Sequence, residues 1–341
     1  MRPFPDVPQL ARRGLLYLRD PHRLVAEGRR LGPRWSFRHP VYGHVLVVSS
    51  PELGEEMLAG DYRLAGAERY VDWLGLGTPL QPIPEEARRL LLRYVDRAIV
   101  KSDPHYYVER ALRPFTGTGG DVGPALRTAA LAWLLDLICQ SDQTRLQIAA
   151  STARAWQRAA RTVPLLVPCL RSWSPRFEDL VPAKLRLLAA LGDCEPGLLM
   201  DGRNGTYLAG GFLTLLGPIA DALPMVAMAA LTYRDPIFAR RIDRALAVAH
   251  PVPLLLLETR GDGPRYTAVD LGGAGLPFGL SPYSPLLRAI VRKFATVALG
   301  VASQLDLTPT SDPTCARVRL CTGPVGLRMA KWPGDRGTPR P

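Results

Sequence analysis

Residues 20–60 read DPHRLVAEGRRLGPRWSFRHPVYGHVLVVSSPELGEEMLAG, and this stretch indicates the fold more strongly than any other. Apolar residues at helical spacing occupy Pro21–Leu31, and a Gly-Pro pair follows that typically ends a helix. Two short strand-like runs then flank a turn at Tyr42-Gly43, which predicts a β-hairpin over residues 35–50. Ser50-Pro51 is typical of a helix start. The stretch therefore predicts a helix, a hairpin and a second helix.

The rest of the chain is predicted to be mainly helical, with small β sheets. Apolar residues at three- and four-residue spacing predict a helical core over residues 84–232. A buried strand is expected at 252–257 and a long apolar helix at 286–304. A closing hairpin is expected over 316–330, turning around Thr322-Gly323-Pro324. No shift in composition divides the chain, so we expect residues 1–341 to form a single domain.

The composition favours a folded protein and argues against nucleic acid as a partner. Hydrophobic residues make up 47% of the chain and charged residues 22%, which is typical of a globular protein. The formal net charge is +12, but the arginines are spread along the chain and no basic motif is interleaved with aromatic residues. We therefore expect no binding of nucleic acid, and the positive charge favours an acidic protein partner instead.

The cysteines and the apolar stretches indicate in which cellular compartment we expect the protein. The five cysteines are an odd number and lack the spacing of a zinc site, so free thiols in a reducing cytoplasm are the simplest interpretation. The first residues contain no apolar run of the kind found in signal peptides. The apolar stretch 208–231 is interrupted by Pro218, Asp221 and Pro224, which favours a core helix over a membrane span. We expect a cytoplasmic protein without a bound metal.

Four phrases, in this order along the chain, resemble the cytochrome P450 superfamily. Residues 20–60 are similar to the first helix, hairpin and second helix of that family. LGPIADALPMVAMAALTYRDP (216–236) resembles the long central helix on the distal side of the haem. HPVPLLLLE (250–258) resembles the strand after the Glu-x-x-Arg helix, and LPFGLSPYSP (276–285) resembles the proximal loop. The resemblance implies a shortened P450-like fold, mainly α with small β sheets.

The same resemblance indicates that the residues serving the haem are lost. The family binds its haem iron through a cysteine thiolate; that position falls at Pro285, and no cysteine lies between Cys194 and Cys315. The glutamate and arginine of the Glu-x-x-Arg pair fall at Arg244 and Ala247. Neither the iron ligand nor the pair that stabilises the fold behind the haem is therefore retained.

Two more haem functions are missing in this comparison. The acid and threonine that deliver protons to bound oxygen fall at Ile219 and Ala220. The histidine and arginine that bind a haem propionate fall at Ala87 and Leu91. Two segments within 236–278 are also shorter than their counterparts in the family. We therefore expect no haem cofactor and no monooxygenase activity.

Haem binding through another ligand is the remaining redox alternative. Tyr283 lies two residues before Pro285, and tyrosine is a haem ligand in some proteins. His250 follows the altered helix of Arg244 and Ala247. The simpler interpretations are a loop tyrosine and a helix-end histidine.

Two functions are compatible with a P450-like chain that lacks haem. The resemblance extends to haem-free relatives that bind and activate glycosyltransferases of bacterial antibiotic pathways, which implies a non-redox auxiliary protein of a partner enzyme. Alternatively, the apolar cavity orients a terpenoid or polyketide for cyclisation or isomerisation, with Asp221 as proton donor. A solvated or arginine-paired Asp221 is the competing interpretation. The residues expected to line such a cavity are Gly217, Ile219, Ala220, Val252, Pro253 and Leu254.

Overall fold

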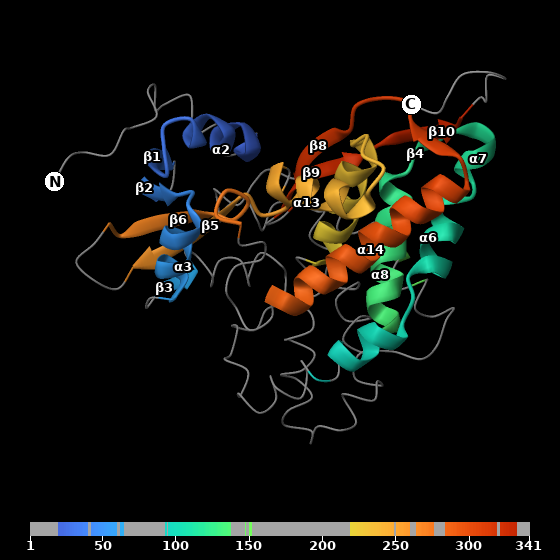
Figure 1. Cartoon of the computed structure of the whole chain (residues 1–341), viewed down its shortest axis with the longest axis horizontal. Helices are drawn as coiled ribbons and strands as arrows, with labels where there is room; N and C mark the ends of the chain where they lie inside the picture. Colours follow the sequence, from blue (N-terminus) through green and yellow to red (C-terminus); the bar gives the residue numbers. More distant parts are fainter. Residues whose placement is uncertain are drawn as a thin grey trace, which may run out of the picture.

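The fold was analysed in a computed structural model of the chain. The structure describes residues 20–39, 42–59, 62–64, 93, 95–137, 147, 150–151, 219–248, 250–259, 264–275, 284–318 and 321–332. In Figure 1 the largest sheet lies at one end of the molecule, and most of the described helices lie at the other.

The largest sheet joins the start of the chain to a segment about two hundred residues later. Its strands, in spatial order, are β1 (Arg34–His39), β2 (Gly43–Val48), β6 (Tyr266–Asp270), β5 (Leu254–Thr259) and β3 (Tyr62–Leu64). All neighbouring strands are antiparallel except β2 and β6, which run parallel. The blue N-terminal strands therefore lie beside the orange strands in Figure 1.

The predicted N-terminal elements are present. The hairpin predicted over 35–50 is confirmed, because β1 pairs with β2 from Arg34 opposite Val48 to His39 opposite Gly43. Helix α2 (Pro21–Arg29) precedes it and helix α3 (Pro51–Ala59) follows it. The Ser50 hydroxyl accepts a hydrogen bond from the Leu53 amide at 3.3 Å, as expected of an N-cap.

Both faces of this sheet bury apolar side chains, and the alternation along each strand decides which face each residue covers. One face packs against α2, with Trp35 and Phe37 at its centre, both 0% exposed. The other face carries Val48 and Val269 and packs against partly buried side chains of α3. The sheet is thus enclosed between two helices that the sequence places on either side of the first hairpin.

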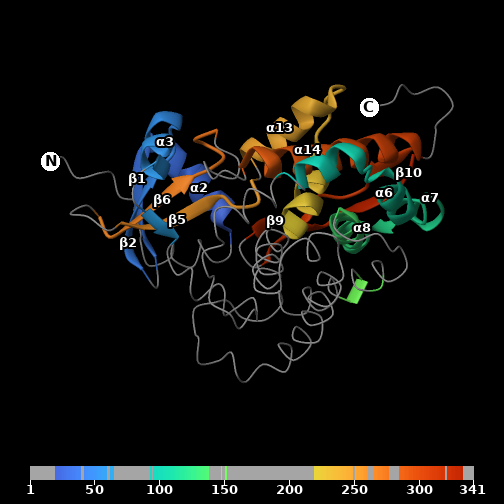
Figure 2. The same ribbon diagram turned by 90° about the horizontal axis from the view of Figure 1, so that it is seen from below.

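The helical part forms a separate and larger hydrophobic core. It contains α6 (His105–Leu112), α7 (Phe115–Thr118), α8 (Gly123–Asp136), helical residues 219–232, α13 (Phe238–Val248) and α14 (Ser284–Gln304). The long helix predicted at 286–304 is confirmed as α14, which crosses α8 in Figure 1 and lies beside α6 in both views (Figures 1 and 2). Trp133 of α8 stacks on Phe294 of α14 with ring centroids 6.0 Å apart. The predicted helical core 84–232 lies only partly within the described residues.

The C-terminal strands differ from the prediction in where the chain turns. The hairpin consists of β8 (Thr314–Val318) and β9 (Cys321–Gly326), and Val318 pairs with Cys321. The predicted turn at Thr322-Gly323-Pro324 is therefore wrong, since these residues lie inside β9. Proline is tolerated there because the sheet has only two strands, so each strand is an edge. The last strand, β10 (Arg328–Lys331), instead pairs with β4 (Gly120–Asp121) and β7 (Leu307–Pro309).

Gly28 of α2 allows the close approach of Trp35 to this helix. A Cβ atom at Gly28 would lie 2.3 Å from the Trp35 ring, which is also fixed by a 3.0 Å hydrogen bond from its Nε1 to the Ser49 hydroxyl. Gly28→Ala should lower the free energy of unfolding by about 1–3 kcal/mol, although alanine favours helix more than glycine does. Gly300→Ala in α14 is the matched control, because a Cβ there meets nothing within 4 Å. It should raise stability by about 0.5–1 kcal/mol in the same urea titration; equal effects of the two variants would contradict this packing.

Candidate functional site

The first turn of α14 is the place where the sequence comparison put the haem ligand. Helix α14 begins at Ser284, and the exposed Pro285 is its second residue. Proline suits a first helical turn, where its missing N–H breaks no hydrogen bond, but its side chain has no atom that binds iron. Cys315 and Cys321 lie elsewhere, in the β8–β9 hairpin. The residues described at this turn therefore do not fit a haem–thiolate centre.

Helix α13 carries the two positions assigned to the Glu-x-x-Arg pair. Arg244 is exposed, and its guanidinium carbon lies 4.6 Å from the centroid of the Tyr233 ring. Ala247 is exposed too, and its carbonyl oxygen accepts a hydrogen bond from Arg29 Nη1 at 3.4 Å. A third residue, Arg241, donates to the carbonyl oxygens of Ala230 and Leu231, both at 2.9 Å. These bonds satisfy carbonyls at the end of helix 219–232.

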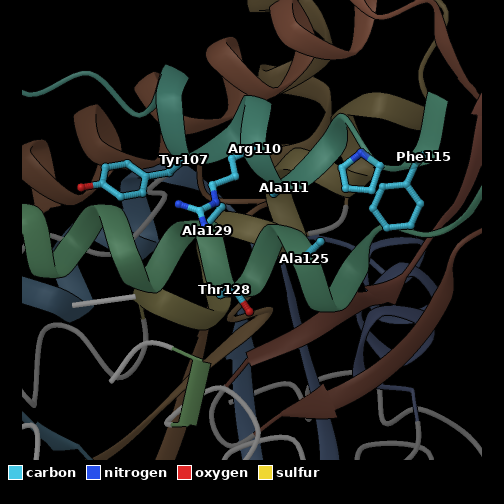
Figure 3. A pocket seen from close by; sticks show the side chains of 8 residues that line it. Tyr107, Arg110, Ala111, Phe115, Ala125, Thr128 and Ala129 are labelled. Carbon is cyan, nitrogen blue, oxygen red and sulfur yellow. The ribbon is translucent and has the colours of Figure 1, made fainter. Parts of the chain in front are cut away.

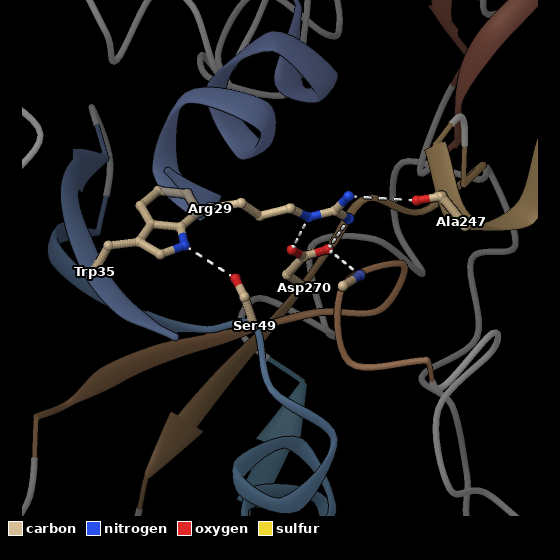
Figure 4. Close-up of polar contacts among 6 residues, drawn as sticks. Arg29, Trp35, Ser49, Ala247 and Asp270 are labelled. Carbon is tan, nitrogen blue, oxygen red and sulfur yellow. Dashed lines mark hydrogen bonds and ion pairs between the residues drawn. The ribbon is translucent and has the colours of Figure 1, made fainter. Parts of the chain in front are cut away.

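A half-buried ion pair, which no pattern in the sequence predicted, joins α2 to β6 (Figure 4). Arg29 Nε lies 2.6 Å from Asp270 Oδ2, and Arg29 Nη2 lies 2.7 Å from Asp270 Oδ1. Asp270 is 0% exposed and also accepts a hydrogen bond from the Gly273 amide at 2.9 Å. The hydrogen bond to Asp270 raises the pKa of Arg29 above its ordinary value. Because the partners are 241 residues apart, no local pattern could reveal the pair.

Asp221, the predicted proton donor, is completely buried. Its side chain is 0% exposed within helical residues 219–232, so the solvated interpretation of this residue is wrong. Asp221 and Met225 are four residues apart and therefore lie on the same face of the helix. Whatever surrounds that face decides whether the carboxyl group has access to a substrate.

Side chains from three segments pack on that face and form what we call the Met225 cluster. Its buried members are Ala222 and Met225 of the helix and Cys321 of β9, and the partly buried Val252 and Val325 pack against them. Gly323 of β9 adds to this contact, because a Cβ there would lie 3.3 Å from Met225 Sδ. The end of the β8–β9 hairpin thus packs directly on the central helix.

The described cavity-lining candidates fall in three different hydrophobic clusters. Ile219 and Ala220 pack in the helical core, Val252 in the Met225 cluster, and Leu254 in the sheet core around Trp35. Pro253 is buried beside Leu254. The remaining predicted site positions, Gly217, Ala87 and Leu91, lie outside the described residues, as does Tyr283.

His250 stabilises the chain between α13 and β5. It is 2% exposed, and its Nδ1 atom lies 3.0 Å from the amide nitrogen and 2.8 Å from the carbonyl oxygen of Val252. A hydrogen bond therefore forms in either neutral tautomer. Burial lowers the pKa of His250 from 6.5 to about 4, so the ring is neutral at pH 7.

Solved structures with a similar fold are cytochrome P450s. The chain superposes on the haem domain of cytochrome P450DA with a TM-score of 0.66 and 13% identity, covering 97% of both chains. A mutant of P450 EryK in complex with erythromycin B gives a TM-score of 0.64 at 15% identity, over 98% of this chain and all of that one (100%). One structure from work on unusual P450-like monooxygenases of microbial secondary metabolism gives 0.58 at 14%, over 84% and 92%. Neither a protein-family model nor a curated protein matches the sequence.

The chain therefore has a cytochrome P450-like fold, and the prediction of a mainly α fold with small β sheets is confirmed. None of the helices described in the structure combines the length and apolar character needed to cross a membrane. The described part of the chain also contains no group of three His, Cys, Asp or Glu side chains that could bind a metal ion.

The low pKa of His250 predicts how stability depends on pH. The unfolded chain, with a pKa of 6.5, binds this proton more readily than the folded chain, with a pKa of about 4. The free energy of unfolding should therefore decrease as the pH falls from about 6.5 to about 4, by up to about 3 kcal/mol from this residue. Urea titrations of His250→Asn should show a shallower decrease over this range than the unaltered protein. Identical slopes for His250→Asn and the unaltered protein would rule out His250.

Proposed function

We propose that this chain is a haem-free P450-like protein that acts as a non-redox auxiliary of secondary metabolism, binding and activating a partner enzyme of the glycosyltransferase type. The observation that carries the proposal is Pro285 in the first turn of α14. A P450-like monooxygenase needs a thiolate at this helix to activate oxygen, and proline supplies none.

The Met225 cluster supports a binding role over a catalytic one. In the cyclase alternative, β9 and the residues before β5 would have to stand away from the central helix to admit a terpenoid or polyketide. Instead, Cys321 and Met225 are both 0% exposed and belong to one packed cluster with Val252. Opening this contact would expose apolar side chains to water, which costs roughly 25 cal/mol for each Å².

The outer face of α13 has the character of a protein interface. Arg240, Arg244 and Val248 are exposed there, Val248 at 59%, and Ile237, the residue before α13, is 45% exposed. Arginine mixed with apolar side chains is typical of surfaces that bind proteins. The net charge of +12 favours a partner whose docking surface is acidic.

Absorption spectra test the first part of this proposal, the absence of haem, and a rate assay tests the second part, the activation of a partner enzyme. Protein produced with excess haem precursor should be folded by circular dichroism and show no stoichiometric Soret band, either before or after reduction under carbon monoxide. A haem-binding P450 produced in the same way is the control. A stoichiometric Soret band would contradict the proposal.

The second part requires a glycosyltransferase whose gene neighbours the gene of this protein. Adding the protein should raise the rate of glycosyl transfer, and Arg240→Glu combined with Arg244→Glu should weaken that activation at least about tenfold because both charges face an acidic partner. Arg30→Glu combined with Arg38→Glu, at two exposed positions in the sheet region, is the matched control and should activate normally. Full activation by the double variant would contradict the α13 interface.

The complete burial of Asp221 is the observation that favours the alternative, a haem-independent cyclase or isomerase. If the purified protein alone converts a terpenoid or polyketide, and Asp221→Asn abolishes that conversion, the alternative replaces the auxiliary role.

A further inference from the structure

A hollow between α6 and α8 lies outside every site discussed above (Figure 3). Its volume is about 330 Å³. This is near the lower limit of small-molecule sites, which measure about 300–1,000 Å³. The residues that line it are Tyr107, Arg110, Ala111, Pro114, Phe115, Ala125, Thr128 and Ala129.

The interior of the hollow is apolar because alanine side chains lie between the rings of Tyr107 and Phe115. Tyr107 and Ala129, which both line it, are buried, at 7% and 4% exposed. Ala111 and Ala125 are partly buried, and the absence of larger side chains at these positions leaves space between the helices. The Phe115 ring limits the hollow at one end, as Figure 3 shows. Thr128 donates its hydroxyl proton to the Pro124 carbonyl at 3.1 Å, so this polar group is already satisfied.

One charged group lies at this hollow. Arg110 is exposed, and its Nη1 donates a hydrogen bond to the Tyr106 hydroxyl at 3.2 Å. Within the described ranges, no carboxylate forms an ion pair with Arg110, whereas the next arginine, Arg113, is paired with Glu109. The guanidinium of Arg110 therefore keeps donors that can bind an anion.

We propose that the hollow between α6 and α8 binds a small apolar carboxylate, such as a medium-chain fatty acid, with its tail among the alanines and its carboxylate on Arg110. The planar guanidinium matches a carboxylate in two parallel hydrogen bonds. The tail gains about 0.8 kcal/mol for each buried CH₂ group. This site is independent of the proposed auxiliary function, since it shares no residue with α13, α14 or the Met225 cluster.

Calorimetric titrations of the full chain with octanoate, octanol and octylamine test the proposal. Octanoate should bind about tenfold more tightly than octanol, and octylamine should bind most weakly, because only the carboxylate pairs with Arg110. Arg110→Gln should remove the preference for octanoate over octanol. Arg240→Gln makes the same change of charge on α13 and should leave the preference intact.

A second variant tests whether the alkyl tail of the ligand lies in the hollow. Ala125→Leu fills the hollow at a partly buried position, and the folded variant should bind neither octanoate nor octanol. Circular dichroism confirms folding, and Thr128→Leu replaces this variant if it fails to fold. Octanoate affinity that is unchanged in both Arg110→Gln and the filled variant would overturn the proposal, as would the absence of binding to the unaltered protein.

Discussion

The described structure depends on one ion pair, between the half-buried Arg29 and the fully buried Asp270. It joins α2 to β6, the central strand of the largest sheet, and Arg29 also reaches the carbonyl of Ala247 at the end of α13. A carboxylate that is 0% exposed is stable only with charged or hydrogen-bonding partners. Asp270 has two donors from Arg29 and one from the Gly273 amide. Arg29 therefore holds the ends of α2, β6 and α13 close together.

In our proposal, this pair helps to keep a P450-like fold in a chain that lacks the residues that normally serve the haem. The positions assigned to the Glu-x-x-Arg pair, Arg244 and Ala247, are both exposed on α13. The same helix is instead held at its end by Arg29, and Arg241 contacts the end of the central helix. The Met225 cluster adds direct packing between that helix and β9. In our proposal, contacts within the polypeptide replace those that a cofactor would mediate.

Local patterns in the sequence predicted the elements, but not the contacts that join them. The hairpin over 35–50 and the helix at 286–304 were predictable, because alternation and helical spacing are encoded within each segment. The turn predicted at Thr322-Gly323-Pro324 was wrong, because Gly323 lies within β9 and its lack of a side chain allows a close contact with Met225. The Arg29–Asp270 pair and the hollow beside Arg110 depend on residues brought together by the tertiary fold, and such proximity leaves no local pattern.

A double-mutant cycle on Arg29 and Asp270 is the most direct test of this account. Arg29→Met, Asp270→Leu and the double variant would be unfolded in urea and compared with the unaltered chain. We expect Arg29→Met to lose about 2–4 kcal/mol, because it leaves the buried Asp270 carboxylate without its charged partner, and Asp270→Leu to lose less, because the half-buried Arg29 side chain keeps access to water. The double variant should lose at least about 1 kcal/mol less than the sum of the two. Additive losses, within about 0.5 kcal/mol, would contradict the claim that this pair holds the fold together.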